Sequence, residues 1–476
     1  MTLATPNKNT KFLRDLLDRE LTFSDNGTEV GSINYISKSP KYFIRAKALQ
    51  KESFLPFLTE ETAVPIRPQV FVDYNLKEGD ILISKDSNIG EVVILDKDLP
   101  NHTISGALYK LPITKNKYYI LAFLKHNHFR KQLDLLVPKG STIRHAKTLF
   151  LDCKIPFPNQ KNKDEVILYV ELLMQAIIDK EKEIRNKHQQ ILQKIEKELL
   201  ENQKDNEFEY EKPTFNEIKK VGRLDIGLYS IEFKKLDFLF KNYKYGFFRL
   251  KDKGYRAVRG PNLAVSVIGI TVYSNEKKDN FYNLVQPTDL SEFGTIQTER
   301  YFGNKKKLPL LKQGDIIFGA EGNIGKCFVI CNKLDNTITN YHGMSITNDK
   351  NSSLIERIFV GMFILFLRKK DFFNFYAVGG QGGSFGKEKT ENLIIPNFPK
   401  TKQKEIASLY HNPVKYPQNL NLKNFLEEDK KWNKKTGIIE IDKSMKQIKK
   451  HLNSLLNKIV NDKKIELSFD FLYRKN

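Results

Sequence analysis

Two stretches of the chain carry apolar residues at helical spacing over an unusual length. The stretch from Lys163 to about Gln203 contains no Gly or Pro, and its apolar side chains recur every seven residues, at Val170, Ile177, Ile184 and Ile191. Near the C-terminus, apolar residues alternate steps of four and three, at Ile441, Met445, Ile448, Leu452, Leu455 and Ile459. A mean period of 3.5 residues is typical of a helix whose apolar seam packs against another helix. Two such seams in one chain can bury each other, which predicts an antiparallel coiled coil.

Outside these stretches, short apolar runs alternate with turns rich in Gly and Asn, and one such segment occurs twice. GDILISKDSNIGEVVIL (79–95) returns without a gap as GDIIFGAEGNIGKCFVI (314–330), at a separation of 235 residues (314 − 79). The triplet Asn-Ile-Gly lies between two β-rich runs in each copy, and Gly and Asn tolerate the backbone angles of tight turns. We therefore expect a hairpin in each half that belongs to the framework of the fold. Residues that differ between the two copies, including SKDS (84–87) against GAEG (319–322), are expected to provide sequence discrimination.

The order of features after each hairpin is also repeated. An apolar segment with helical spacing follows, at 118–136 and 356–376, and then a loop rich in Gly, Ser and basic residues. A Pro-containing stop and a long helix complete each half, so the pattern predicts a tandem duplication. The expected fold is a pseudo-symmetric α/β (α+β) protein with two globular domains joined by two long helices. The expected parts are a first domain (1–160), a central helix (161–205), a second domain (206–400) and a C-terminal helix (401–476).

The C-terminal helix contains an insertion that has no counterpart in the central one. Pro and Gly interrupt it at about 414–437, and the only tryptophan of the chain, Trp432, lies there. A lone exposed Trp suits a docking anchor, whereas a buried one suits a small satellite core. Both interpretations are open from the sequence.

Composition adds a preference for a polyanionic partner. The chain of 476 residues has 79 Lys+Arg against 57 Asp+Glu, a formal charge of +22, although a generally basic composition would give the same excess. Three cysteines cannot form a disulfide framework, so we expect a reducing compartment, with Cys327 and Cys331 in the core. No stretch has the roughly 20 apolar residues of a membrane span, and the N-terminus has no signal-like segment, so we expect no membrane partner and a cytoplasmic location.

Catalytic motifs are weak throughout. GAEGNIGKC (319–327) departs from a phosphate loop in spacing and in the residue after its Lys. YHNPVKYP (410–417) has Asn-Pro without the arrangement that amino-methyltransferases use, and the eight histidines show no metal-ligand spacing. We expect no catalysis, no metal and no cofactor in this chain.

The loops offer candidate DNA contacts instead. Gly lets the backbone approach phosphates, Lys and Arg neutralise them, and Asn, Gln or Arg can read base edges. The candidates are Lys85, Asn88, Lys139, Ser141, Thr142, Arg144, His145, Arg256, Arg259, Asn262, Lys305, Asn323, Gln381, Ser384 and Lys387. A solvated surface turn is the alternative for each loop taken alone, and recurrence at equivalent places favours DNA.

The whole pattern resembles the specificity subunit of Type I restriction-modification systems. The resemblance rests on the two GD…NIG segments, the GST and GGSF loops, the IPFPNQ and IPNFP stops and the helix that follows each. It implies two target-recognition domains that each read half of a bipartite double-stranded DNA target, with the helices as a ruler between them. It further implies that two methyltransferase subunits and restriction subunits join the chain and bring S-adenosylmethionine, ATP and Mg, in a bacterial or archaeal cytoplasm. The insertion departs from the family pattern and puts a symmetric docking surface for those subunits in doubt.

Two alternatives fit the same residues. One is the separate specificity chain of a fused restriction-methylation enzyme. The other is a non-catalytic duplicated scaffold whose seams bind partner helices.

Overall fold

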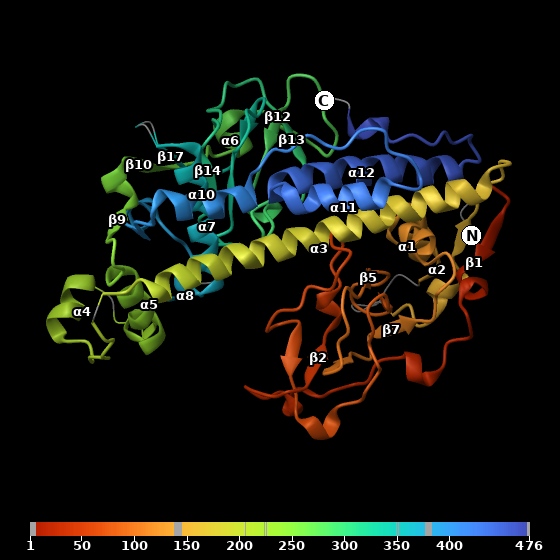
Figure 1. Cartoon of the computed structure of the whole chain (residues 1–476), viewed down its shortest axis with the longest axis horizontal. Helices are drawn as coiled ribbons and strands as arrows, with labels where there is room; N and C mark the ends of the chain where they lie inside the picture. The colour runs from red at the N-terminus through yellow and green to blue at the C-terminus, as the bar shows by residue number, and fades with distance from the viewer. Residues whose placement is uncertain are drawn as a thin grey trace. The chain divides into compact units, whose positions relative to one another are not determined.

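The computed structural model describes residues 6–137, 145–204, 206–222, 224, 226–348, 350, 352–376 and 383–473. Its chain forms two compact units (Figure 1). Unit 1 comprises Met1–Glu183, Val414–Lys435 and Ile441–Asn476, and unit 2 comprises Ile184–Pro413 and Thr436–Glu440. The 39-residue helix α3 (Lys163–Glu201) is continuous and contributes its first part to unit 1 and its second part to unit 2.

Short strands and helices make up each unit. The strands of unit 1 are β1 (Thr10–Phe12), β2 (Tyr42–Ile44), β3 (Ala63–Pro65), β4 (Ile81–Ser84), β5 (Val92–Ile94), β6 (His102–Ile104), β7 (Leu108–Leu111) and β8 (Lys154–Pro156). Those of unit 2 are β9 (Phe247–Arg249), β10 (Tyr255–Arg259), β11 (Val272–Ser274), β12 (Tyr282–Leu284), β13 (Arg300–Gly303), β14 (Ile316–Gly319), β15 (Cys327–Val329), β16 (Thr337–Ile338), β17 (Gly343–Asn348) and β18 (Ile394–Pro396). Besides α3, the helices are α1 (Lys117–Lys125), α2 (Asn127–Leu136), α4 (Phe215–Val221), α5 (Ile231–Lys241), α6 (Val265–Ile268), α7 (Leu354–Lys369), α8 (Phe372–Tyr376), α9 (Lys387–Glu391), α10 (Lys400–Tyr410), α11 (Phe425–Lys435) and α12 (Ile438–Val460).

The expected hairpin is present in both units with the same register. In unit 1, β4 lies between β5 and β7, and Ile81 pairs with Ile94 and Leu111. In unit 2, β14 lies between β15 and β17, and the equivalent Ile316 pairs with Val329 and Ile346. Each residue of the second set stands 235 positions after its counterpart, so the duplication extends from the sequence to the hydrogen-bonding pattern. The strands β4 and β14 are buried along their whole length, and their apolar side chains contribute to a hydrophobic core in each unit.

A second small sheet is also duplicated. The strand β2 pairs antiparallel with β3 and parallel with β6, and β12 pairs in the same way with β13 and β16. Unit 2 adds β11 at the outer side of β13. The parallel pair brings together strands that are distant in the chain, and the antiparallel pairs close each sheet locally.

The apolar segments after the hairpins are helical, as expected. In unit 2 the segment forms α7, which is buried along 358–367. In unit 1 the helical segment is divided at His126, which has an extended backbone and accepts a hydrogen bond from the backbone N–H of His128 at the start of α2. A side-chain acceptor of this kind satisfies one of the unpaired N–H groups of the new helix. Cys327 and Cys331 are buried and carry free thiols, which confirms them as core residues.

The two predicted long helices are antiparallel where they meet in unit 1. Asn159, just before α3, donates to the Asp462 carboxylate just after α12 at 2.8 Å. Ten residues further along α3, Tyr169 lies 3.0 Å from His451, eleven residues back along α12. The seam residues of both helices are buried. In unit 2 the second part of α3 is joined to α10 by ion pairs, Lys194 with Glu405 at 3.5 Å and Lys402 with Glu198 at 3.6 Å.

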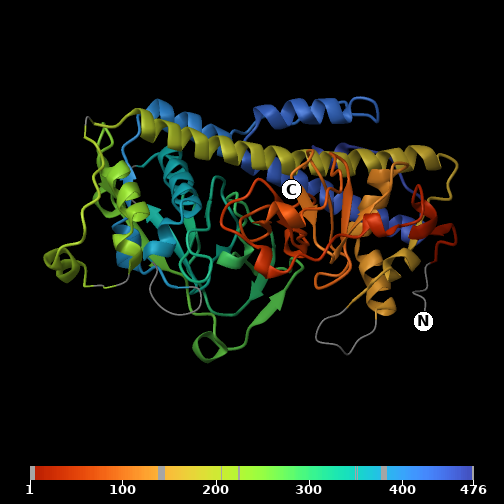
Figure 2. The same cartoon turned by 90° about the horizontal axis from the view of Figure 1, so that it is seen from below.

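The insertion in the C-terminal helical region packs against α3. Helices α11 and α12 both lie along the first part of α3 (Figures 1 and 2). Lys180 of α3 is fully buried, and its ammonium lies 2.6 Å from the Asp429 carboxylate and 4.8 Å from the centre of the Trp432 ring. Trp432 is itself buried and donates from Nε1 to the carbonyl of Val414 at 3.0 Å. The tryptophan is therefore a core residue of the insertion.

Candidate nucleic-acid interface

The turn of the unit 1 hairpin presents polar residues from a rigid base. Ser87 and Gly90 have positive φ angles of 64° and 72°, and they reverse the chain between β4 and β5. Asn88 is exposed at this turn, and the Lys85 ammonium lies 5.0 Å from the centre of the Tyr109 ring. An open groove beside the turn is lined in part by Asn88 and Arg130.

The segment after the basic loop returns to this hairpin. His145 and Asp86 form an isolated antiparallel bridge, and the His145 Nδ1 lies 2.7 Å from an Asp86 oxygen. The backbone N–H of Ala146 donates to the carbonyl of Lys85 at 2.8 Å. The structure thus brings Lys85, Asn88 and His145 together. The other predicted residues of this loop, Lys139, Ser141, Thr142 and Arg144, lie outside the described residues.

Unit 2 repeats this attachment at equivalent positions. Glu321 stands 235 residues after Asp86 and bridges to Ser384, and the N–H of Phe385 donates to the carbonyl of Ala320 at 2.8 Å. Asn323 is half-buried in the turn, where Gly322 takes the positive φ that Ser87 takes in the first copy. Lys387 is exposed at the start of α9 and lies 3.8 Å from Glu391, whereas Gln381 lies outside the described residues.

An arginine-centred cluster lies against the unit 2 hairpin. The Arg259 guanidinium contacts a Glu321 oxygen at 3.1 Å, donates to the carbonyl of Tyr341 at 3.0 Å and lies over the Tyr341 ring at 5.2 Å. The other Glu321 oxygen is 2.7 Å from Nδ1 of His342. A guanidinium held on an aromatic ring has lost much of its conformational freedom before a ligand arrives, which suits base or phosphate recognition. Tyr341 and His342 were not among the sequence candidates, because no local pattern links them to Arg259.

In each unit an arginine from a neighbouring helix hydrogen-bonds the backbone of the hairpin turn. The Arg130 guanidinium of α2 donates to the carbonyl of Ile89 and pairs with Glu91 at 2.6 Å. In unit 2, Arg368 of α7 donates to the carbonyl of Ile324 in the same way. It also pairs at 2.8 Å with Glu292. Burial alone would raise the pKa of Glu292, but Arg368 and Lys326 outweigh it and lower the pKa. These framework arginines hold the turn and were not predicted either.

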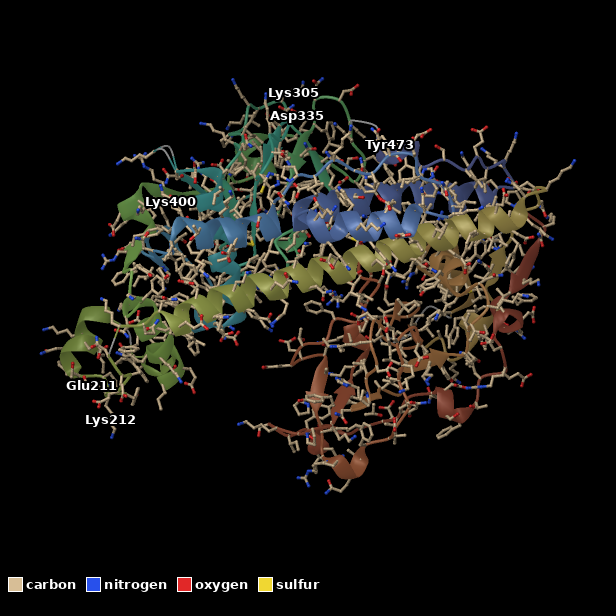
Figure 3. All side chains as sticks on the ribbon, viewed as in Figure 1. Glu211, Lys212, Lys305, Asp335, Lys400 and Tyr473 are labelled. Atoms are coloured by element: carbon tan, nitrogen blue, oxygen red, sulfur yellow. The ribbon has the colours of Figure 1, made fainter. Side chains whose placement is uncertain are left out.

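The remaining candidates lie away from the turns. Arg256 is exposed on β10, and Lys305 is exposed after β13, at the outer edge of unit 2 (Figure 3). Asn262 is exposed, but its side-chain oxygen accepts a hydrogen bond from the N–H of Ala264 at 3.0 Å, so it forms a turn just before α6. Asn262 therefore has a structural role in addition to any contact with a ligand.

Among the described residues, no group of His, Cys, Asp and Glu side chains is placed to hold a metal ion. In the same part of the chain, no helix is long and apolar enough to cross a membrane. The arrangement offers cationic and amide groups on rigid turns, which is chemistry suited to binding DNA.

Comparison with known proteins gives one family. A model described as the Type I restriction modification DNA specificity domain matches residues 28–210 and 268–415, together more than half of the chain. None of the curated proteins with which the chain was compared matches it.

Solved structures also match over most of the chain. The Type I restriction-modification S subunit from M. genitalium is 12% identical, with a TM-score of 0.37, and the match covers 98% of this chain and 100% of that one. The HsdS subunit from Thermoanaerobacter tengcongensis is 11% identical, with a TM-score of 0.27 and coverages of 90% and 95%. A chain from a study of complex assembly and conformational transition of the type I R-M system is 10% identical, with a TM-score of 0.29 and coverages of 96% and 98%.

Proposed function

The chain belongs to the Type I restriction-modification DNA specificity family, and we propose that it reads a bipartite DNA target, one half with each unit. Members of this family recognise DNA and perform no chemistry themselves. The observation that carries the proposal is the duplication, because the hairpin register, the returning loop and the supporting arginine recur in both units. Two copies of one DNA-binding framework with different turn residues suit two different half-sites.

The helices provide the spacing in this proposal. α3 is continuous over 39 residues, about 58 Å at 1.5 Å per residue, and it contributes to both units. Two weak readers on a stiff spacer gain affinity through effective concentration only when the gap between half-sites matches the spacer. The gap length is then a property of the helices, and the base preference a property of the units.

Catalysis is delegated to partners. We assign to the chain two methyltransferase subunits, which bring S-adenosylmethionine and modify adenine, and ATP- and Mg-dependent restriction subunits that join them in the cytoplasm. The insertion at Val414–Lys435 enlarges unit 1 alone, so the two units offer unequal surfaces for this assembly.

A selection experiment tests the proposal. The chain, assembled with its methyltransferase subunits, is used to select duplexes from a library that is random over about 20 base pairs. Two conserved blocks at a constant gap are expected. A single block, or no block together with salt-insensitive binding, would contradict bipartite reading.

A further inference from the structure

In the part of the chain that the structure describes, each unit has one isoleucine that is almost completely exposed. Ile33 of unit 1 is 82% exposed and Ile270 of unit 2 is 87% exposed. Ile33 lies in a short 3-10 turn (Ser32–Asn34), and Ile270 lies between α6 and β11. An isolated exposed apolar residue is ordinary, so these two require an argument from their positions.

The strand register shows that the two isoleucines are equivalent. Tyr35 bridges to Ile66 just after β3, and Val272 pairs with Gly303 at the end of β13. Both partners differ by 237 residues (272 − 35 and 303 − 66). Each exposed isoleucine stands two residues before the first member of its pair. An isoleucine of similar exposure therefore occupies the equivalent position in both units.

Exposed cations lie just after the paired strand in each unit, although at positions that are not equivalent. In unit 1 the N–H of Arg67 donates to the carbonyl of Asn34 at 3.0 Å, and Arg67 is exposed. Its equivalent in unit 2 is Asn304 (304 − 67 is again 237), whose amide donates to the carbonyl of Ile270 at 3.0 Å. The exposed lysines 305–307 follow it directly.

The exposed surface around Ile270 is apolar at its centre and basic at its rim. Val265, Val267 and Tyr273 are also exposed. Lys305 and Asp335 both lie at the outer edge of unit 2 (Figure 3). Apolar side chains in water do not stabilise the fold, whereas contact with an apolar group of a ligand removes their surface from water. The cationic rim selects an anionic ligand, and duplex DNA combines phosphates with an apolar thymine methyl group in its major groove.

We infer that Ile33 and Ile270 contact base edges in the DNA groove, one in each half-site, while the neighbouring Arg67 and lysines 305–307 contact phosphates. This inference rests on the proposed function and assigns to it two specificity residues. Since each isoleucine belongs to one unit, each governs one half of the target.

The test uses the chain assembled with its methyltransferase subunits and carrying Ile33→Ala or Ile270→Ala. Selected duplexes are sequenced for each variant, and affinity is measured on the wild-type target and on unrelated DNA. Ile33→Ala is expected to relax base preference in one block only, and Ile270→Ala in the other, each with about tenfold weaker binding to the target. Binding to unrelated DNA should be unchanged, because the phosphate contacts remain.

Leu224→Ala is the matched control, since Leu224 is 82% exposed in unit 2 and lies outside its strands. It should bind as the wild type does. Wild-type base preference in both isoleucine variants, or an equal loss on target and unrelated DNA, overturns the inference. A wild-type complex that selects no bipartite target would instead overturn the proposed function, so the two failures are distinct.

Discussion

Removing the buried charge of Lys180 should detach the insertion from α3. The Lys180 and Asp429 side chains are both fully buried, and the ammonium is also 2.8 Å from the Asn433 side-chain oxygen. Burial lowers the pKa of Lys180, and the Asp429 carboxylate opposes this by favouring the charged form. The carboxylate also accepts hydrogen bonds from the Tyr416 hydroxyl and the Asn433 amide. The pair is thus fully buried, with polar partners from the insertion.

The expected loss in the free energy of unfolding depends on which charge is left without its partner. Lys180→Met leaves a buried carboxylate that keeps two hydrogen-bond donors, so we expect a loss at the lower end of the range of about 3–5 kcal/mol for breaking a buried pair. Asp429→Leu leaves a buried ammonium and should cost about as much. The variant with both substitutions carries no buried charge, so it should recover at least about 2 kcal/mol relative to the sum of the two losses.

Trp432 makes the assay direct, because it is the only tryptophan of the chain and its ring faces the Lys180 ammonium. Urea unfolding followed by tryptophan fluorescence should show a midpoint lowered by about 1 M or more in Lys180→Met. Lys182→Met is the control in the same helix. Its ammonium lies 3.4 Å from Glu78 on the surface, and its loss should cost less than about 1 kcal/mol. A wild-type midpoint in Lys180→Met, or strictly additive losses in the double variant, would refute the reasoning.

Three further predictions concern pH, the arginine cluster and the helices. Burial lowers the pKa of His126 in unit 1 and of His188 in unit 2 to about 4. The unfolded chain therefore binds more protons than the folded one between pH 6.5 and 4, and the free energy of unfolding should fall by up to about 3 kcal/mol for each histidine as the pH is lowered through that window. Urea unfolding of His126→Gln and His188→Gln should show a flatter pH dependence, and an unchanged pH dependence would contradict this. Arg259→Ala should weaken DNA binding and reduce its salt dependence, and Arg259→Lys should not restore it, because Lys lacks the planar group that lies on Tyr341; binding isotherms at two salt concentrations decide. Seven residues added to α3, with a matching seven in its antiparallel partner helix, lengthen the helices by about 10 Å. This change should widen the gap between the two selected base-pair blocks by about three base pairs without changing either block. A changed block would exclude the helices as the spacer.

The regular parts of the fold were predictable because local patterns determine them. The seven-residue repeat predicted α3, which runs from Lys163 to Glu201, and the repeated Asn-Ile-Gly triplet predicted two hairpins whose registers proved identical. The apolar segment at 356–376 was predicted to be helical, and α7 and α8 lie there. In each case the signal lies within one segment of the chain.

The remaining features depend on contacts between distant segments. Arg259, Glu321 and His342 meet from three separate strands or turns, and no local pattern links the three positions to one another. Ile33 and Ile270 are equivalent at an offset of 237 residues, whereas the hairpins align at 235, so the gapless alignment of the hairpins does not superimpose the isoleucines. The insertion is largely polar in sequence, and its fold depends on the buried partner that α3 supplies.

The most direct test of the central claim is to map methylated adenines across the genome of the host organism, with and without the gene for this chain. The account predicts one bipartite motif, with two defined blocks and a constant gap, that is methylated only when the chain is present. Exchanging the segment 206–400 for that of a related chain should then replace one block and leave the other and the gap intact. A motif that persists without the chain, or a single continuous motif, would contradict the account.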